Sequence, residues 1–294
     1  MNRPSYKLIQ DPEYGFLRID PVPTREEVDR YYREEFYSKL KSFNDSALEV
    51  QLEEKEFMDS RWAAMCDACR RVLGRVQGLS VLDVGCGFAQ ALLYFREQGM
   101  EASGLEPAPE GVAYARAKGV EVFEADIEDF DCVGGRRFDV VTLINVLEHL
   151  RQPAETLRQI RDKLLNRGGL LILDVANEFN DFQTTADAEY RLNQWWLCPP
   201  NHINYFSVTS LCRLLERCGF NVVHKEASFP VELFMLLGDV YVRHPALGRD
   251  CHKKRVQFER LMRKHGKADK LSRFYQALAE LDLGRQVVVG ATPR

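Results

Sequence analysis

Short apolar runs alternate with amphipathic segments along the chain from residue 79 onward. The runs carry β-branched residues, as expected of strands that are buried on both faces of a parallel sheet. Strands that alternate with helices in this way indicate the α/β class. The strands expected from the pattern span residues 81–84, 100–105, 120–125, 137–144, 170–175, 220–223 and 286–290.

The segment before the first strand has a different pattern. Residues 1–78 are expected to form a mostly helical extension that begins in extended or turn structure. Capping-box patterns at Thr24 and Ser46 open two helices, which we expect over 24–40 and 46–76. The extension is interpreted either as a structural cap over the sheet or as a lid over a ligand, and the two roles are compatible.

The remaining chain divides into three parts by the same criteria. Residues 79–230 form the α/β core, and within it 176–206 is expected to be a long functional loop that is rich in aromatic residues. A helical insertion over 231–284 is a candidate acceptor or dimer element, so a homodimer is left open. Residues 285–294 supply the last strand of the core.

Particular residues stand where the strands end, and an open α/β sheet binds its ligand beyond those ends. Gly85 and Gly87 follow the first strand and precede a helix, which places backbone N–H groups and a helix N-terminus against a ligand. Glu106, 21 residues beyond Gly85, is placed to accept both ribose hydroxyls of a bound nucleoside. The alternative for Glu106 is a solvated strand end.

The next two strands also end in polar residues. Asp126 could accept from an adenine amino group while Ile127 packs on the ring, although Asp126 could instead cap a helix that starts at Ile127. Asn145 follows the fourth strand. Four suitable residues at four strand ends are much stronger evidence than any one of them.

These motifs resemble class I S-adenosylmethionine (SAM)-dependent methyltransferases over residues 79–223. The resemblance rests on D-V-G-C-G at 83–87, G-L-E-P at 104–107, A-D-I-E-D at 125–129, N-V-L-E-H at 145–149 and the Gly168-Gly169 turn. It implies a Rossmann-like sheet of seven strands, the last antiparallel. It also implies SAM-binding positions at Asp83, Gly85, Gly87, Glu106, Asp126, Ile127 and Asn145.

Further likeness lies outside the core motifs. Y-G-F-L at 14–17, H-I-N-Y-F-S at 202–207 and the run at 235–242 look like the bacterial UbiG-like (methyltransferase-23-type) group. The chief departure from the family is Ala89, which stands where the loop usually has a third glycine.

The cofactor that the resemblance implies sets the expected mechanism. SAM would give its methyl group by direct in-line transfer and leave S-adenosylhomocysteine, with no metal in the simplest case, so catalysis would be mainly positioning. We expect a small-molecule or glycan-type acceptor that attacks through oxygen, and a histidine base. The candidates are His149 and His202, each of which could instead be structural, His149 as a cap of its turn and His202 as a loop hydrogen-bonder.

Composition narrows the partners and the compartment. The chain has 40 basic and 44 acidic residues, a net charge of −4, so it lacks the basic field typical of nucleic-acid binders. No apolar run reaches about 18 residues and the N-terminus leads into no apolar segment, which favours a cytoplasmic protein without a membrane partner. Eight cysteines are expected to be reduced thiols, and Cys66 and Cys69 share a helix face.

Two other functions compete with methyl transfer. An NAD-dependent oxidoreductase could use the same glycine turn, but Gln90 stands where that fingerprint has Gly or Ala, and Asp83 and Asp126 would have no role. A non-catalytic SAM-fold binding protein would use its helical ends for partners. The intact glycine, Glu106 and Asp126 positions argue against it.

Overall fold

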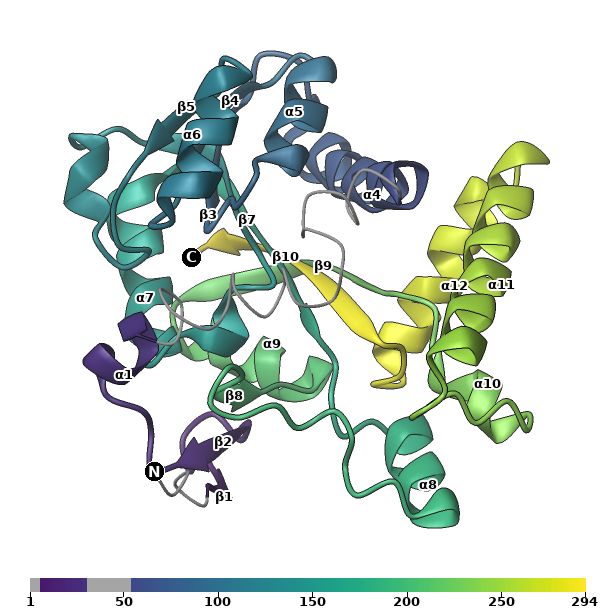
Figure 1. Cartoon of the computed structure of the whole chain (residues 1–294). Coiled ribbons are helices and arrows are strands. Elements are labelled where there is room, and N and C mark those ends of the chain that lie inside the picture. Colours follow the sequence, from purple (N-terminus) through teal and green to yellow (C-terminus); the bar gives the residue numbers. More distant parts are fainter. Residues whose placement is uncertain (1–5, 31–53) are drawn as a thin grey trace.

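The computed structural model describes residues 6–30 and 54–294, and its main feature is a seven-stranded sheet in the order β5-β4-β3-β6-β7-β10-β9 (Figure 1). Strand β10 runs antiparallel to β7 and β9, whereas β5, β4, β3, β6 and β7 are parallel. The expected fold class and the antiparallel last strand are confirmed. The strands are β3 Ser80–Val84, β4 Glu101–Leu105, β5 Glu121–Phe123, β6 Phe138–Ile144, β7 Leu165–Ala176, β9 Phe220–Ala227 and β10 Gln286–Pro293.

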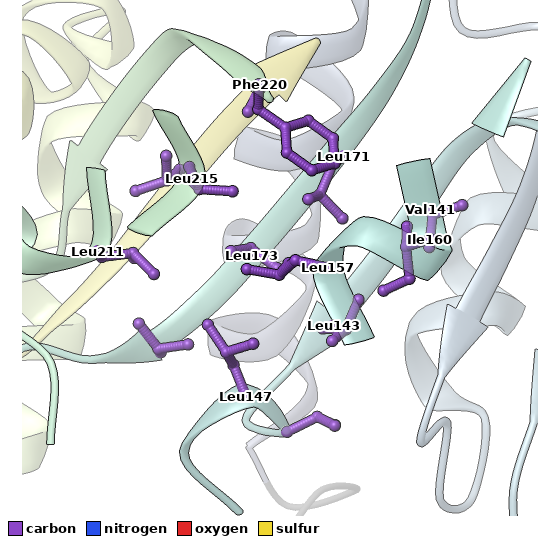
Figure 2. Close-up of a cluster of buried hydrophobic side chains, with 14 of the residues drawn as sticks. Val141, Leu143, Leu147, Leu157, Ile160, Leu171, Leu173, Leu211, Leu215 and Phe220 are labelled. Carbon is purple, nitrogen blue, oxygen red and sulfur yellow. The ribbon is translucent and has the colours of Figure 1, made fainter. Parts of the chain in front are cut away.

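Two hydrophobic clusters cover the two faces of this sheet because successive strand residues point to opposite sides. Leu82 and Leu143 face a cluster built with α7 Pro153–Gln159, the π-helical turn η4 Ile160–Leu164 and α9 Val208–Arg217. The second cluster contains side chains of α4 Lys55–Leu73, α5 Gln90–Glu97 and α6 Pro109–Ala117. Figure 2 shows leucines of α7 and α9 directed at those of β6 and β7.

Residues 7–20 form a hairpin, which agrees with the extended or turn structure expected at the start of the extension. Strands β1 Lys7–Gln10 and β2 Leu17–Asp20 pair with each other, and β2 pairs with β8 Asn204–Tyr205. Helix α1 Arg25–Arg30 follows, and the predicted capping box is confirmed: the Thr24 N–H donates to Glu27, and the Glu27 N–H donates to Thr24 Oγ1.

The structure tests only part of the two helices expected in the extension. Residues 31–53, which include the second capping box, lie outside the described residues. Helix α4, which ends at Leu73 and is capped by Gly74, bears out the later part of the predicted second helix.

The prediction of a continuous loop over 176–206 is wrong, because α8 Asp181–Tyr190 lies within it. Asn180 caps this helix by accepting from the Gln183 N–H. Only two of its residues, Gln183 and Ala186, are buried, so the helix presents no apolar stripe for the sequence to display.

Helices fill the segment between β9 and β10, as expected. They are α10 Glu232–Leu236, α11 Pro245–Lys264 and α12 Ala268–Glu280. Ser272 of α12 donates to Glu226 of β9 at 2.7 Å, and Figure 1 shows the long pair α11 and α12 at the far end of the sheet from β5. Short 3₁₀ helices occupy η2 Phe130–Val133 and η3 Leu147–His149.

The cysteines and the apolar character of the helices were also considered in the sequence, and the structure describes both. All eight cysteines are free thiols, and Cys66 and Cys69 are buried on α4, where burial raises the pKa of the Cys66 thiol to about 11 and that of Cys69 to about 12. None of the helices in the described ranges has the length and apolar character needed to cross a membrane.

Candidate active site

The glycine loop connects β3 to α5 at the carboxyl edge of the sheet. The Gly85 N–H donates to the Leu105 carbonyl at 2.8 Å, which holds the loop against the next strand. A Cβ on Gly85 would lie 2.7 Å from Val146 Cγ2, so a side chain is excluded there. At Gly87 (φ +52°) a Cβ would meet no heavy atom within 4 Å, so this part of the loop faces open space. The loop therefore offers bare main chain to a ligand.

Ala89 explains why a third glycine is usual at this position of the loop. It is the N-cap of α5 and has left-handed backbone angles, φ 54° and ψ 26°. A Cβ carries a steric cost in that region, which glycine avoids. Alanine is nevertheless accommodated, and its methyl group is fully buried.

Glu106 lies directly against the glycine loop. One carboxylate oxygen accepts from the Gly87 N–H and the other from the Ala108 N–H, both at 2.8 Å. The residue is only 5% exposed, which contradicts the alternative of a solvated strand end. A carboxylate has about four lone-pair sites, so these two bonds leave capacity for hydroxyl donors. The structure thus brings together the glycine loop and the predicted ribose acceptor.

Asp126 has local partners at the end of β5. Its Oδ1 accepts from the Glu128 N–H at 2.9 Å, and its Oδ2 accepts from Arg25 of α1 at 2.7 Å. The helix-cap alternative is wrong in detail, because the next helix is η2 and its N-cap is Asp129. Ile127 is partly buried against the core cluster that contains Phe130.

Asp83 lies beneath the loop rather than in it. It is 2% exposed, and Thr142 of β6 donates to its Oδ1 at 2.6 Å. Burial, reinforced by the charge of Glu106, raises the pKa of Asp83 to about 7. This hydrogen bond joins β3, the strand that leads into the glycine loop, to β6, and Thr142 is a partner that the sequence did not indicate.

Asn145 begins a chain of polar contacts that spans four elements. Its Oδ1 accepts from Gln286 of β10 at 2.8 Å, and its backbone has φ 54°. Gln286 accepts from Arg61 of α4, which also forms an ion pair with the buried Asp174 of β7. Burial outweighs this guanidinium and raises the pKa of Asp174. No local motif joins these residues, so sequence reasoning missed all of Asn145's partners.

The two candidate histidines lie in contact beyond β6. The ring centroids of His149 and His202 are 4.9 Å apart and the rings are nearly perpendicular. His149 Nδ1 lies 2.7 Å from the Asn201 carbonyl, which ties η3 to the loop that carries His202. His202 Nδ1 lies 3.9 Å from Glu178 Oε1.

Burial shifts the pKa values of the two histidines and of the neighbouring Glu148 and Glu178. It lowers the pKa of His149, and burial together with His149 and Arg285 lowers the pKa of His202 to about 3. The pKa of Glu148 is raised to about 8 and that of Glu178 to about 7, again mainly by burial. Both imidazoles are therefore neutral near pH 7. A base with a pKa near 3 accepts a proton poorly, so this environment does not favour His202 as a general base.

Comparison with known proteins places this site in a family context. The family model described as a methyltransferase domain matches residues 46–225. The tRNA U34 carboxymethyltransferase of Tolumonas auensis is 30% identical over 167 residues, 52% of this chain and 48% of that protein. The ubiquinone biosynthesis O-methyltransferase of Cereibacter sphaeroides is 32% identical over 158 residues, 51% of this chain and 63% of that protein. The chain thus spans less than two thirds of either relative.

A solved structure gives the same fold. The 1,6-didemethyltoxoflavin-N1-methyltransferase of Burkholderia thailandensis, with bound 1,6-didemethyltoxoflavin and S-adenosylhomocysteine, superposes with a TM-score of 0.54 at 18% identity. The match covers 96% of each chain. The likeness shows a shared fold.

Proposed function

We propose that this protein, which belongs to the class I SAM-dependent methyltransferase family, transfers a methyl group from SAM to an oxygen atom of a small-molecule acceptor. The observation that carries the proposal is the contact of Glu106 with the Gly87 N–H at the open face of the glycine loop. A carboxylate fixed beside bare main chain at the end of β4 is suited to a nucleoside.

The residues present fit the cofactor. Gly85 and Gly87 would offer main chain to it, and Glu106 would accept from the ribose hydroxyls. Asp126 and Ile127 would hold the adenine ring, with Asn145 at the next strand end and Asp83 supporting the loop from below. When bound, SAM supplies a methyl group on a positively charged sulfur, which the acceptor takes in one in-line displacement.

The role left to the chain is to position the acceptor and exclude water. His149 and His202 are proposed to contact the acceptor, because they lie together beyond β6, next along the edge from Asn145. The neutral ring of His202 can accept a hydrogen bond from an acceptor hydroxyl, and His149 is proposed to hold that ring in place.

The names of the relatives favour a small molecule that is methylated at oxygen, and they give no support to a glycan acceptor. The name of one relative specifies O-methylation in ubiquinone biosynthesis, and neither name mentions a glycan. The other relative makes tRNA a second candidate acceptor. The net charge of −4 argues against it, since affinity for nucleic acid depends on phosphate neutralisation by basic residues.

Calorimetric titration with SAM, S-adenosylhomocysteine and NAD tests the cofactor assignment. We expect binding of the first two and none of NAD. Glu106→Ala should weaken SAM binding at least tenfold, about 1.4 kcal/mol. The control is Glu101→Ala, an exposed glutamate at the opposite end of the same strand, which should bind SAM normally. Unchanged affinity in Glu106→Ala, or binding of NAD alone, would overturn the proposal.

Transfer of a labelled methyl group tests the acceptor. Purified protein is incubated with labelled SAM and either a panel of hydroxylated small molecules or bulk tRNA. Label in a methyl ether of a small molecule supports the proposal. Label in tRNA alone would replace it with the second candidate.

A further inference from the structure

We propose that a cavity between the N-terminal hairpin and α7 binds the phosphate or carboxylate group of a small organic ligand. The cavity has a volume of about 500 Å³, and its walls come from residues between 11 and 22 and between 151 and 158. Small-molecule sites typically have volumes of about 300–1,000 Å³. None of the described residues that line this cavity was assigned to SAM or to the methyl acceptor. The inference therefore does not rest on the proposed function.

Three arginines from distant segments line the cavity. Arg18 belongs to β2, Arg151 precedes α7, and Arg158 lies within α7. A guanidinium group stays charged at any physiological pH and presents five N–H donors in one plane. This planar fork matches the oxygens of a carboxylate or a phosphate group, so arginines are favoured where proteins recognise these groups.

Uncharged oxygen atoms of the protein hold the three guanidinium groups in place. Arg18 Nη2 donates to the Arg151 carbonyl at 3.2 Å, and Arg151 Nε donates to the Pro23 carbonyl at 2.8 Å. Arg158 Nη2 donates to the Tyr14 hydroxyl at 2.9 Å. Each of these bonds uses one of five N–H donors and fixes the side chain without cancelling its charge. The arginines are thus oriented by the fold and keep capacity for an anion.

The positive charge in the cavity wall exceeds the negative charge. Two carboxylates line the cavity together with the three guanidinium groups. Asp11 lies 3.9 Å from Arg18, and Glu155 lies 4.0 Å from Arg158. Both distances exceed the limit of about 3.2 Å for a good hydrogen bond between nitrogen and oxygen. An anionic group of the ligand could therefore bind more closely to the arginines than either carboxylate does.

Arg18 has a donor that the protein leaves without a partner. Its side chain is 22% exposed, but its Nε is buried and has no hydrogen-bond partner among the described residues. Buried polar atoms in native proteins are almost always paired, so an exception needs an explanation such as an absent ligand. A rotation of the guanidinium group towards an anion in the cavity would give this atom the acceptor that it lacks.

Apolar side chains in the same wall narrow the class of ligand. Tyr14 and Phe16 of the hairpin stack with their ring centroids 6.1 Å apart, and Val22, Pro153 and Ala154 also line the cavity. Ligand sites commonly combine such apolar walls with a few polar groups that fix the orientation of the ligand. The cavity is therefore suited to a carboxylic acid or a phosphate ester that carries an apolar body.

Calorimetric titration of the full-length protein with three probes tests the site. Benzoate and phenyl phosphate present the two candidate anionic groups on an aromatic ring, and benzamide is the uncharged analogue of benzoate. We expect at least one of the two anions to bind about tenfold or more tightly than benzamide, because hydrogen bonds to charged groups are stronger. The anion that binds more tightly identifies the ligand as a carboxylic acid or as a phosphate ester.

Two variants should change the affinity for the preferred anion in opposite directions. Arg151→Gln removes one guanidinium group and should weaken binding about tenfold or more. Glu155→Gln removes an exposed carboxylate that competes with the ligand, so it should strengthen binding about two- to fivefold. The matched control is Arg167→Gln, an exposed arginine near the start of β7, which should leave the affinity unchanged.

The position of the bound anion is tested against the proposed SAM site. Saturating S-adenosylhomocysteine should leave anion binding unchanged, and so should Glu106→Ala, which is expected to lose SAM affinity. Loss of one kind of binding can therefore be distinguished from loss of the other. Competition between the anion and S-adenosylhomocysteine would place the anion at the glycine loop and overturn the inference.

Three other results would contradict an anion site in this cavity. They are no binding of either anion at millimolar concentration, equal affinity for benzamide and the anions, and unchanged affinity in folded Arg151→Gln. Circular dichroism checks that each variant is folded. If Arg151→Gln does not fold, Glu155→Gln decides, because its exposed side chain is replaced by one of similar size. Unchanged or weaker binding in that variant would then overturn the site.

Discussion

At the carboxyl edge of the main sheet, the acidic side chains of the two halves have different kinds of partner. In the half formed by β3, β4 and β5, Glu106 and Asp126 accept from nearby backbone N–H groups. In the half formed by β6 and β7, Asp174 depends on Arg61 from a distant helix, and Glu148 retains a carboxylate oxygen without a partner in the described chain.

The difference shows how the two halves are built. Ala108 and Glu128 donate from the same loop as the acid that each serves, and Gly87 donates to Glu106 from the neighbouring loop. The first half therefore relies mainly on backbone donors. The second half is assembled from segments far apart in sequence. Its stability depends on single side chains, and loss of one leaves a buried charge uncompensated.

Arg61→Ala should be the most damaging change, because it removes the partner of Asp174 in the second half. Asp174 is 1% exposed, and breaking a buried pair costs about 3–5 kcal/mol. Chemical denaturation measures the free energy of unfolding. Arg70→Ala is the control, since Arg70 lies on the same helix in an exposed pair with Asp67 and should cost less than about 1 kcal/mol. Equal losses would remove the contrast between buried and exposed pairs.

Asp83→Asn should change how stability depends on pH, in the first half of the edge. The pKa of Asp83 is raised to about 7 in the folded protein, above its ordinary value of 3.8. Between these values the folded state holds a proton that the unfolded chain has lost, so this group stabilises the fold at low pH and loses that contribution as pH rises towards 7. The effect is at most about 4 kcal/mol.

Denaturation of wild-type protein and Asp83→Asn at pH 5 and pH 8 isolates this contribution. The variant should gain stability relative to wild type as pH rises, because asparagine does not titrate. A difference that stays constant across this range would show that Asp83 ionises normally in the fold.

Ala89→Gly and Ala91→Gly compare the effect on stability at two buried alanines at the start of α5. Ala89 has φ 54°, so relief of about 1–2 kcal/mol of left-handed strain should offset the loss of a buried methyl group, about 0.8 kcal/mol. Ala91 is in regular helix and should cost about 1–2 kcal/mol. Thermal and denaturant unfolding measure both. A larger loss at Ala89 than at Ala91 would contradict the strain argument.

Arg25→Ala should have the smallest effect. Its ion pair with Asp126 joins α1 to the first half of the edge, but Arg25 is 63% exposed. Exposed pairs contribute about 0–1 kcal/mol, so unfolding should shift by less than that. Raising the salt concentration should abolish even this difference between the variant and wild type. A loss above about 2 kcal/mol would mean that the first half also depends on remote side chains.

The sequence indicated how residues are placed in the first half of the edge and gave little indication of the contacts in the second half. Gly85, Gly87, Glu106 and Asp126 are found at strand ends because strand, turn and acidic residue are adjacent in the chain. Arg61, Gln286 and Glu178 carry no such local signal. Glu178 lies in the segment wrongly expected to be a continuous loop, and the pairing of residues 177–178 with Phe206 brings it near His202.

The sequence by itself determined the seven strands of the main sheet along the chain, the glycine loop and the acidic residues that follow β4 and β5. Those features follow from short-range rules of periodicity, turn formation and capping. Only the tertiary structure decided which remote groups meet. The contact of His149 with His202 and the Arg61–Asp174 pair arise when residues from separate segments are buried together. The same burial leaves one carboxylate oxygen of Glu148 and one of Glu178 without a hydrogen-bond partner among the described residues. Their charges and pKa values depend on that shared burial, which no single stretch of sequence encodes.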